Sequence, residues 1–319
     1  MASKTRKKRP GVSGNPQKAR AQVGPRPAQR AGVGDWIEGA RLRTLPLAVS
    51  PVLLGTGAAL VIDNALHWLL ALGCLAVAVL LQIGVNFAND YSDGVRGTDD
   101  FRVGPARLTG AGKAKPRTVL IVALTFFALA ALAGLALTIR TQQWWFLAVG
   151  AVCIVGAWFY TGGKRPYGYA GLGEVVVFVF FGLVATLGTT WVQVQVLPQE
   201  AWFGAVAAGL FACAVLLANN LRDIVPDRKA GKKTLSVRIG KRATQVLFSV
   251  IVLVPFAISI FLALFYPPAW LTLLVLLLVL PAILIVWTYR EPKELVVALS
   301  LTSLGSLAYA ALVFWALHG

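Results

Sequence analysis

The sequence of 319 residues is 57% hydrophobic and only 13% charged, and its mean hydropathy is +0.72. So much apolar surface is atypical of a water-soluble domain and indicates an integral membrane protein. Thirty Lys and Arg against thirteen Asp and Glu give a net charge of +17, which in a soluble protein would suggest a nucleic-acid partner. The three cysteines lie singly in apolar runs, and with only two histidines this argues against a disulfide framework and a zinc or haem site.

Residues 1–34 are rich in Pro, Gly, Lys and Arg and contain almost no apolar side chains. Such a segment cannot bury enough surface to fold, so we predict a disordered basic tail here and one membrane domain over residues 35–319. We expect the tail to lie near anionic lipid rather than to bind nucleic acid.

Nine apolar stretches follow, and each approaches the roughly 20 residues that a helix needs to cross a bilayer. They cover residues 44–62, 66–88, 118–138, 144–160, 170–191, 202–221, 243–265, 269–288 and 295–317. If the amino terminus is cytoplasmic, 29 of the 30 Lys and Arg lie in inside segments, and Arg140 is the exception. The positive-inside rule therefore predicts an all-α, nine-helix protein with its amino terminus cytoplasmic and its carboxyl terminus outside.

Two polar motifs end the second and the sixth span on the predicted inside. The first contains Asn86, Asp90 and Asp93 at spacings of four and three, which place them on one helix face. The second contains Asn219, Asp223 and Asp227 at spacings of four, with Pro226 expected to bend that helix. Four spans separate the motifs, and their weak similarity suggests a parallel duplication that brings them face to face.

Carboxylates in a membrane protein carry a free-energy cost, which three kinds of site would offset. The first kind of site is a structural network of salt bridges to Arg96, Arg102, Arg222 and Arg228. The second is an ion or proton pathway in a cation transporter. The third is Mg²⁺, which prefers hard oxygen ligands and binds through a few carboxylates plus substrate phosphates. Because a transporter is expected to carry its carboxylates near the bilayer midplane, motifs at helix ends beside basic loops favour an enzyme acting on a lipid diphosphate.

These motifs resemble the Asp-rich motifs of the UbiA superfamily of intramembrane prenyltransferases. The resemblance rests on NDYSDG followed by GTDD, and on NNLRDIVPD followed by GKKTLSVRIG. In the commonest form of the first motif an Asp stands where this sequence has Gly97, and here acids follow at Asp99 and Asp100. In this departure the motif resembles that of the menaquinone-pathway branch, 1,4-dihydroxy-2-naphthoate polyprenyltransferase. Segments 39–46, 102–108 and 160–174 also resemble that branch. The resemblance covers residues 35–319.

The resemblance implies nine helices around a central cavity in a bacterial inner (plasma) membrane, with the active site on the cytoplasmic side. It implies Mg²⁺-dependent transfer of a polyprenyl group from polyprenyl diphosphate to 1,4-dihydroxy-2-naphthoate with decarboxylation, giving demethylmenaquinone. Another acceptor, such as 4-hydroxybenzoate, haem or a sugar phosphate, is the alternative within the superfamily.

In this mechanism four aspartates bind the Mg²⁺ of the diphosphate and neutralise the leaving group; these are Asp90, Asp93, Asp223 and Asp227. Three basic side chains are expected on the phosphates; these are Arg96, Lys164 and Lys232. Without metal the like charges of the aspartates should repel one another, so Asp→Asn changes are expected to stop turnover without lowering stability.

Five further residues complete the predicted site. Asn86 and Asn220 are expected to orient the aspartates, and the Tyr160 ring to face the developing allylic cation. Glu174, an acid inside the fifth span, either forms a salt bridge with Arg41, Arg43 or Lys164 or belongs to the acceptor pocket. Arg43 either binds the carboxylate of the acceptor or anchors the first span at the inside interface.

The asymmetry of the basic residues predicts the orientation of the chain in intact cells. In a cysteine-free background, Thr98→Cys and Ala230→Cys should be protected from a membrane-impermeant thiol reagent, whereas Asn64→Cys and Gln199→Cys should react. Labelling followed by mass-shift electrophoresis measures this pattern, and the reverse pattern would overturn the orientation.

Overall fold

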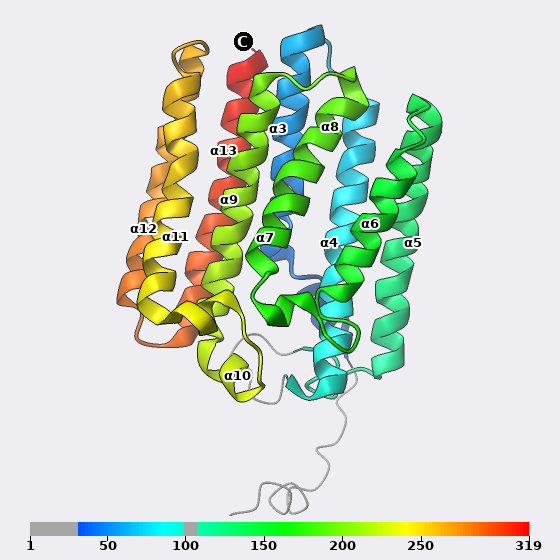
Figure 1. The fold of residues 1–319 in the computed structure, drawn as a ribbon, viewed down its shortest axis with the longest axis vertical. Coiled ribbons are helices and arrows are strands. Elements are labelled where there is room, and N and C mark those ends of the chain that lie inside the picture. The colour runs from blue at the N-terminus through cyan, green and yellow to red at the C-terminus, as the bar shows by residue number, and fades with distance from the viewer. Residues whose placement is uncertain (1–30, 99–106, 319) are drawn as a thin grey trace, which may run out of the picture. The chain divides into compact units, whose positions relative to one another are not determined.

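The computed structural model describes residues 31–98 and 107–318, and within these ranges every regular element is a helix (Figure 1). The long apolar segments are α3 (Pro46–Asp63), α4 (Trp68–Arg96), α5 (Pro116–Thr141), the continuous α7 (Gly173–Val177), η4 (Phe178–Val184) and α8 (Ala185–Val194), then α9 (Gln199–Arg222), α11 (Leu235–Leu262), η5 (Pro267–Val275) with α12 (Leu276–Thr288), and α13 (Leu295–His318). A shorter apolar helix, α6 (Phe146–Phe159), follows α5. The shorter elements are α2 (Val33–Ala40), η1 (Leu42–Thr44), η3 (Tyr167–Ala170), α10 (Ile224–Lys229) and η6 (Pro292–Glu294).

Each of the nine predicted spans coincides with one helical segment of the described chain. Eight of these segments are long and apolar enough to cross a membrane, whereas α6 has only 14 residues. The all-α, multi-pass fold is therefore confirmed, and the fourth span is shorter than predicted.

The folded unit begins at Ala31, four residues before the predicted start of the membrane domain at residue 35. The Ala31 N–H donates to the Lys113 carbonyl oxygen at 3.0 Å, and the Gly32 N–H donates to the Asp35 carboxylate at 2.9 Å. α2 then starts at Val33. The remainder of the predicted tail lies outside the described residues.

α3, α9, α11, α12 and α13 form the larger apolar core, in which α9 contributes a series of buried alanines. Small residues let helix backbones approach closely. Because burying apolar side chains against one another gains little free energy in lipid, this close packing is what drives the helices to associate. Hydroxyl groups add bonds between helices, because Ser306 donates to the Ser50 hydroxyl at 2.9 Å and Thr190 donates to the Gly55 carbonyl at 2.9 Å. α3 and α9 are accordingly the most buried membrane helices among the described residues.

α4 packs mainly against α5, and a separate small core around Phe87 and Phe127 joins these two helices to α2 and the segment after α4. A cavity lies between this group and α9, and it is lined by side chains of α3 to α9. The predicted central cavity is therefore present.

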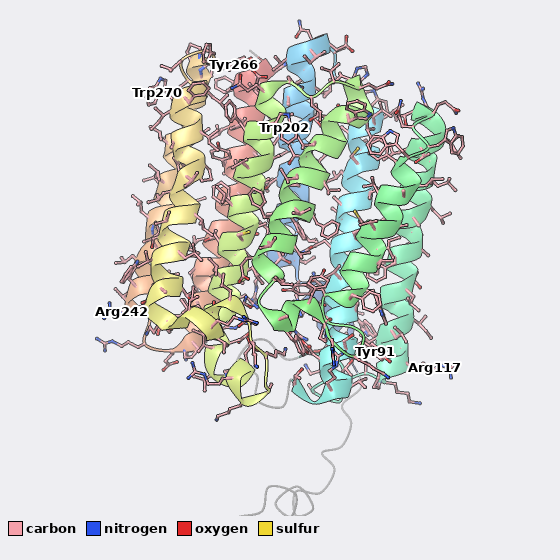
Figure 2. The ribbon with its side chains drawn as sticks, in the orientation of Figure 1. Tyr91, Arg117, Trp202, Arg242, Tyr266 and Trp270 are labelled. Carbon is pink, nitrogen blue, oxygen red and sulfur yellow. The ribbon has the colours of Figure 1, made fainter. Side chains whose placement is uncertain are left out.

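The two ends of the bundle carry different side chains (Figure 2). Trp202, Tyr266 and Trp270 lie at the end where α13 finishes, and Arg117 and Arg242 lie at the opposite end, where α10 is found (Figures 1 and 2). Tyr91 also lies at the α10 end, so labelled aromatic residues occur at both ends, whereas the labelled basic residues lie at the α10 end alone (Figure 2). Aromatic residues at both interfaces and basic residues at one are typical of a membrane protein.

Gly55 supplies a test of the packing between α3 and α8. A Cβ atom at this position would lie 2.5 Å from the Thr186 carbonyl oxygen and 2.8 Å from the Thr189 Cβ. Because backbone cannot yield as a flexible side chain does, Gly55→Ala should cost about 1–3 kcal/mol and lower the Tm in detergent. Gly150→Ala, where the new Cβ meets nothing within 4 Å, is the matched control, and equal Tm changes in both variants would contradict the packing analysis.

Candidate active site

Asp93 is the most heavily paired acid of the first motif, and its side chain is almost completely buried near the carboxyl-terminal end of α4. Its carboxylate accepts hydrogen bonds from the Arg107 guanidinium at 2.5 Å and from the Tyr169 hydroxyl, and the Lys232 ammonium lies 3.4 Å away. These three partners come from three different loops, so one carboxylate joins the ends of several helices.

Asp90 holds the chain that follows the first motif. Its two carboxylate oxygens accept from the backbone N–H groups of Leu108 and Thr109, each at 2.8 Å. Gly94 permits this close approach, because a Cβ there would overlap the Thr109 side chain. The result is that Arg107 reaches both the Asn89 carbonyl oxygen at 2.9 Å and the Asp93 carboxylate.

The second motif lies where α9 ends and α10 begins. The helix breaks at Asp223, with φ −99° and ψ 10°, and not at Pro226 itself. Since a proline ring clashes with the carbonyl four residues earlier, here that of Arg222, the predicted bend falls before the proline. Arg222 holds the Asp223 carboxylate through two nitrogens at 2.8 and 2.5 Å and also donates to the Asn219 side chain at 2.8 Å.

Lys232 connects the two motifs. Its ammonium lies 3.4 Å from an Asp93 oxygen and 3.9 Å from an Asp227 oxygen, and 4.5 Å from the centre of the Tyr169 ring. Backbone bonds position it, because the Lys232 N–H donates to the Asp227 carbonyl at 2.9 Å and the Lys233 N–H donates to the Tyr169 carbonyl at 2.9 Å. The motifs are thus brought face to face, as the duplication hypothesis predicted.

Both motifs line a cavity of about 620 Å³. Its charged lining residues all lie at the motif end; these are Arg41, Asp93, Arg107, Asp223, Asp227 and Lys232. The rest of the lining is predominantly apolar and comes from the middles and far ends of α3 to α9. Such a cavity suits a ligand with an anionic head and a long apolar tail.

A second cavity of about 360 Å³ adjoins the first and shares Arg41, Thr44 and Arg107 with it. Arg43, Asp90 and Arg222 also line it. With four arginines against two acids in its lining, this smaller cavity is suited to an anion.

Two predicted phosphate ligands lie away from these cavities. Arg96 donates to the carbonyl oxygens of Thr161 and Gly163 and lies over the Tyr169 ring at 5.6 Å, so it fastens the loop after α6. Lys164 is exposed on that loop and lines neither cavity.

Tyr160 lines the large cavity, in edge-to-face contact with Tyr167 at 5.6 Å. Asn86, also in its lining, donates to the Ala40 carbonyl at 2.9 Å and so ties α4 to α2. Glu174 is buried and accepts from the Asn220 side chain at 2.9 Å; among the described residues this acid makes no salt bridge, contrary to one of its two predicted roles.

Two tyrosines of the loop after α6 are held in the protonated form. Burial raises the pKa of Tyr167 to about 12, and burial together with the nearby Asp93 charge raises the pKa of Tyr169 above its ordinary value. Both therefore act as hydroxyl donors at neutral pH, Tyr167 to the Gly156 carbonyl at 2.5 Å and Tyr169 to Asp93.

Among the described residues, no three Asp, Glu, His or Cys side chains lie close enough to hold a metal ion by themselves. The donor chemistry nevertheless fits a metal carried by a diphosphate, because Mg²⁺ needs only one or two carboxylates when phosphates supply its other ligands. Asp93 and Asp227 face the same space across the Lys232 ammonium, a cation already held between them. Asp99, Asp100 and Arg102 lie outside the described residues.

Arg107 and Tyr169 both contact Asp93, although neither is among the site residues predicted from the sequence. Both stand in the segments that resemble the menaquinone-pathway branch, which was the available signal. Their bonds to Asp93 span 14 and 76 residues of chain, so no local spacing rule identifies them.

A membrane-embedded bundle with an apolar cavity that is charged at one end defines an enzyme for amphipathic substrates. The model of the UbiA prenyltransferase family matches residues 48–304, and the chain belongs to this family. A 1,4-dihydroxy-2-naphthoate octaprenyltransferase of Mycobacterium tuberculosis is 50% identical over 287 residues, which cover 90% of this chain and 98% of the relative. The enzyme of the same name in Escherichia coli K12 is 41% identical over 219 residues, covering 65% of this chain and 68% of the relative.

Solved structures share the fold. A UbiA homologue from Aeropyrum pernix K1 superposes with a TM-score of 0.63 at 15% identity, covering 84% of this chain and 96% of the homologue. A UbiA homologue from Archaeoglobus fulgidus, bound to GPP and Mg²⁺, superposes with a TM-score of 0.62 at 15% identity, covering 89% and 99%.

The contacts of the aspartates correct the expectation about stability. Asp93 and Asp223 are paired with basic side chains, and Asp90 with backbone N–H groups, so self-repulsion is not the dominant effect in the metal-free protein.

Asp93→Asn should therefore lower the Tm in metal-free detergent. Removing one partner of a buried ion pair leaves the other charge uncompensated, at a cost of roughly 3–5 kcal/mol. Asp63→Asn is the control, because Asp63 pairs with His67 at an exposed position where the expected loss is below about 1 kcal/mol. An unchanged or higher Tm for Asp93→Asn would instead mean that repulsion among the aspartates outweighs their pairing with basic side chains.

Proposed function

We propose that this chain transfers a polyprenyl group from polyprenyl diphosphate to 1,4-dihydroxy-2-naphthoate with loss of CO₂, forming demethylmenaquinone in its reduced form. The observation that carries the proposal is the large cavity, charged only at the end where the two Asp motifs meet. The names of relatives that are 50% and 41% identical support the choice of acceptor and of a polyprenyl donor.

The diphosphate is proposed to lie at the charged end, beside Lys232 and Arg107. In that position Lys232 and Arg107 donate to phosphate oxygens, and Asp93, Asp223 and Asp227 hold the Mg²⁺ that the diphosphate carries. The bound Mg²⁺ supplies charge neutralisation of the leaving diphosphate. Asp90 contributes by holding the backbone of Leu108 and Thr109, which keeps Arg107 in place.

Heterolysis of the allylic C–O bond leaves a carbocation next to aromatic rings. Tyr160, Tyr167 and Tyr169 all line the cavity close to the two motifs. Their π faces attract a cation by roughly 0.5–2 kcal/mol each, while the apolar walls keep water from capturing it.

The acceptor is proposed to occupy the smaller cavity, with its carboxylate towards Arg43 and Arg41. The two cavities share Arg41, Thr44 and Arg107 in their linings, so an aromatic ring in the smaller cavity would lie close to the charged end, where the prenyl carbon leaves the diphosphate. Glu174 acts as a positioning residue, because its contact with Asn220 orients one wall of the large cavity.

We further propose that the protein resides in a bacterial plasma membrane, with both motifs on the cytoplasmic side and the carboxyl terminus outside. The end of the bundle that carries α10 is opposite to the carboxyl terminus (Figure 1), and basic residues gather near it (Figure 2), in agreement with the positive-inside rule.

The direct test incubates the purified protein with a polyprenyl diphosphate, Mg²⁺ and a panel of aromatic acceptors, and identifies products by mass. The expected product has gained the prenyl group and lost CO₂, and it disappears when Mg²⁺ is chelated. Prenylation of only a non-naphthoate acceptor, such as 4-hydroxybenzoate, would refute the acceptor, and cation transport without any prenylation would refute the enzyme.

Arg43→Gln tests the proposed acceptor site. Loss of a charge-assisted bond of about 1.5–3 kcal/mol should raise the KM for 1,4-dihydroxy-2-naphthoate by roughly tenfold or more. The KM for polyprenyl diphosphate should stay within about twofold, and Arg165→Gln, an exposed arginine that lines neither cavity, should change neither value. A rise in the donor KM instead would place Arg43 on the diphosphate.

A further inference from the structure

Beyond its contact with Asn220, Glu174 carries a carboxylate oxygen for which the proposed function gives no role. The side chain is only 8% exposed, and its Oε1 atom accepts from the Asn220 side chain at 2.9 Å. The other oxygen, Oε2, is fully buried and has no hydrogen-bond partner among the described residues. Because a buried polar group without a partner has given up its hydrogen bonds to water, a carboxylate oxygen in this condition indicates that a hydrogen-bond donor binds here.

This condition sets Glu174 apart from the other acids near the cavities. Asp90 accepts from two backbone N–H groups, and Asp93 is bonded to basic and hydroxyl side chains. In residues 31–98 and 107–318, Glu174 Oε2 is the only carboxylate oxygen among the buried side-chain atoms that lack a partner. The Cys213 thiol also donates to the Glu174 carbonyl at 3.1 Å. Bonds to Cys213 and Asn220, both on α9, therefore hold Glu174 in place and leave Oε2 available to a ligand.

The free oxygen lies directly behind one part of the wall of the large cavity. Asn220, which holds the other oxygen, lines this cavity, and so does Val176, two residues further along the chain. Tyr160 lines it as well, and its hydroxyl would lie 3.6 Å from a Cβ at Gly173, the residue before Glu174. The Tyr160 hydroxyl forms no hydrogen bond within the part of the chain that the structure describes. Two oxygens that lack partners thus lie at the same part of the wall.

These two groups select an uncharged hydroxyl rather than an anion. An ionised carboxylate only accepts hydrogen bonds, whereas a tyrosine hydroxyl both donates and accepts. Over the described ranges no Lys or Arg forms a salt bridge with Glu174, so a bound anion would meet an uncompensated like charge. A ligand hydroxyl, in contrast, can donate to Glu174 and accept from Tyr160 at the same time.

We propose that Glu174 and Tyr160 recognise the 4-hydroxyl of the 1,4-dihydroxy-2-naphthoate acceptor, which donates to Glu174 Oε2 and accepts from the Tyr160 hydroxyl. This inference rests on the proposed function and specifies how its acceptor is selected. The 1-hydroxyl lies beside the carboxylate and can donate to it within the molecule, whereas the 4-hydroxyl needs a partner from the protein. Arg41 lines both cavities and lies within electrostatic range of the Tyr160 hydroxyl. An acceptor whose carboxylate is at Arg41 therefore reaches this wall with the far edge of its ring.

The contact also favours the reaction and the choice of substrate. A phenolic hydroxyl that donates to a carboxylate gains partial phenolate character, which raises the electron density of the ring that attacks the allylic carbocation. A site built to bind a hydroxyl also rejects an analogue that lacks it, because the buried acceptor oxygen is then left unpaired.

Two acceptors that differ only in this hydroxyl test the proposal, namely 1,4-dihydroxy-2-naphthoate and 1-hydroxy-2-naphthoate. Glu174→Leu removes the accepting oxygen, so it should lower kcat/KM for the dihydroxy acceptor by roughly ten- to a hundredfold, the scale of a charged hydrogen bond. For 1-hydroxy-2-naphthoate, which has no 4-hydroxyl to lose a partner, kcat/KM should stay within about twofold of the wild type. Glu174→Gln, whose amide offers only a neutral bond, should show a smaller loss with the dihydroxy acceptor alone.

Glu200→Leu is the matched control, because Glu200 also accepts from a hydroxyl, that of Tyr266 at 2.8 Å, but lines neither cavity. It should leave the ratio of kcat/KM between the two acceptors unchanged. A second measurement needs no turnover: under anaerobic conditions, naphthoate fluorescence reports the Kd of each acceptor in the presence of inorganic diphosphate and Mg²⁺. The wild type should bind the dihydroxy acceptor at least about tenfold more tightly, and Glu174→Leu should reduce this preference to about twofold.

Equal losses for the two acceptors in Glu174→Leu, or no loss with either, would overturn the proposal and leave Glu174 with a structural role alone. Equal Kd values of the two acceptors for the wild type would overturn it as well, and this comparison does not require any variant to fold. Absence of prenyl transfer by the wild type with every acceptor would instead refute the proposed function, and the Kd comparison would still decide whether the 4-hydroxyl is recognised.

Discussion

The buried Asp93 carboxylate is the interaction on which the organisation of the site depends. It lies at the end of α4 and gathers Arg107, Tyr169 and Lys232 from three separate loops. Removing a carboxylate from water carries a large free-energy penalty, which only charged or hydrogen-bonding partners offset. Because those partners belong to different segments, satisfying this one group also brings the ends of α4, α6 and α10 together. The second aspartate motif is positioned by the same requirement, through the contact of Lys232 with Asp227.

This arrangement reconciles the salt-bridge and the metal interpretations of the acidic motifs. Within the described chain, basic side chains compensate Asp93 and Asp223, and Lys232 stands between Asp93 and Asp227. A Mg²⁺–diphosphate pair would bring both a cation for the carboxylates and an anion for the lysine and arginine, so Asp93, Asp227, Lys232 and Arg107 could exchange partners without leaving a charge uncompensated. A substrate that matches both sets of charges is favoured over a free cation, which would leave Lys232 and Arg107 without an anion.

The architecture of the bundle separates a rigid part from an open part. α3, α9 and α13 pack through alanines, glycines and hydroxyl bonds, and these contacts form the more buried core. α4, α5 and α6 pack less closely against the helices on the other side of the cavity than α3, α9 and α13 pack against one another. Gly134 and Gly188 place no side chain in the cavity. The tight core holds the charged end in a fixed geometry, whereas the open part provides room for an apolar chain. Preorganised charge and adaptable apolar space are what a reaction between a lipid diphosphate and a small aromatic acid requires.

The amino-acid sequence determined which segments form membrane helices. A chain in lipid must satisfy its backbone hydrogen bonds within each helix, so every apolar run long enough to span the bilayer is expected to be helical. Helix periodicity also predicted that Asn86 and Asp93 share one face, as do Asn219, Asp223 and Asp227, and the similarity of the two motifs suggested that they meet; all five residues line the large cavity. Only the tertiary structure decided which partner each acid takes: Asp93 with Arg107 and Tyr169, Asp90 with the backbone of Leu108 and Thr109, Glu174 with Asn220, and Arg96 with two carbonyls instead of a phosphate. These pairings join residues up to 139 positions apart, as for Lys232 and Asp93, and they depend on how helices pack and how loops turn back over their ends. Local periodicity contains no information about either, so the sequence specifies the elements and the chemistry, and packing specifies the contacts.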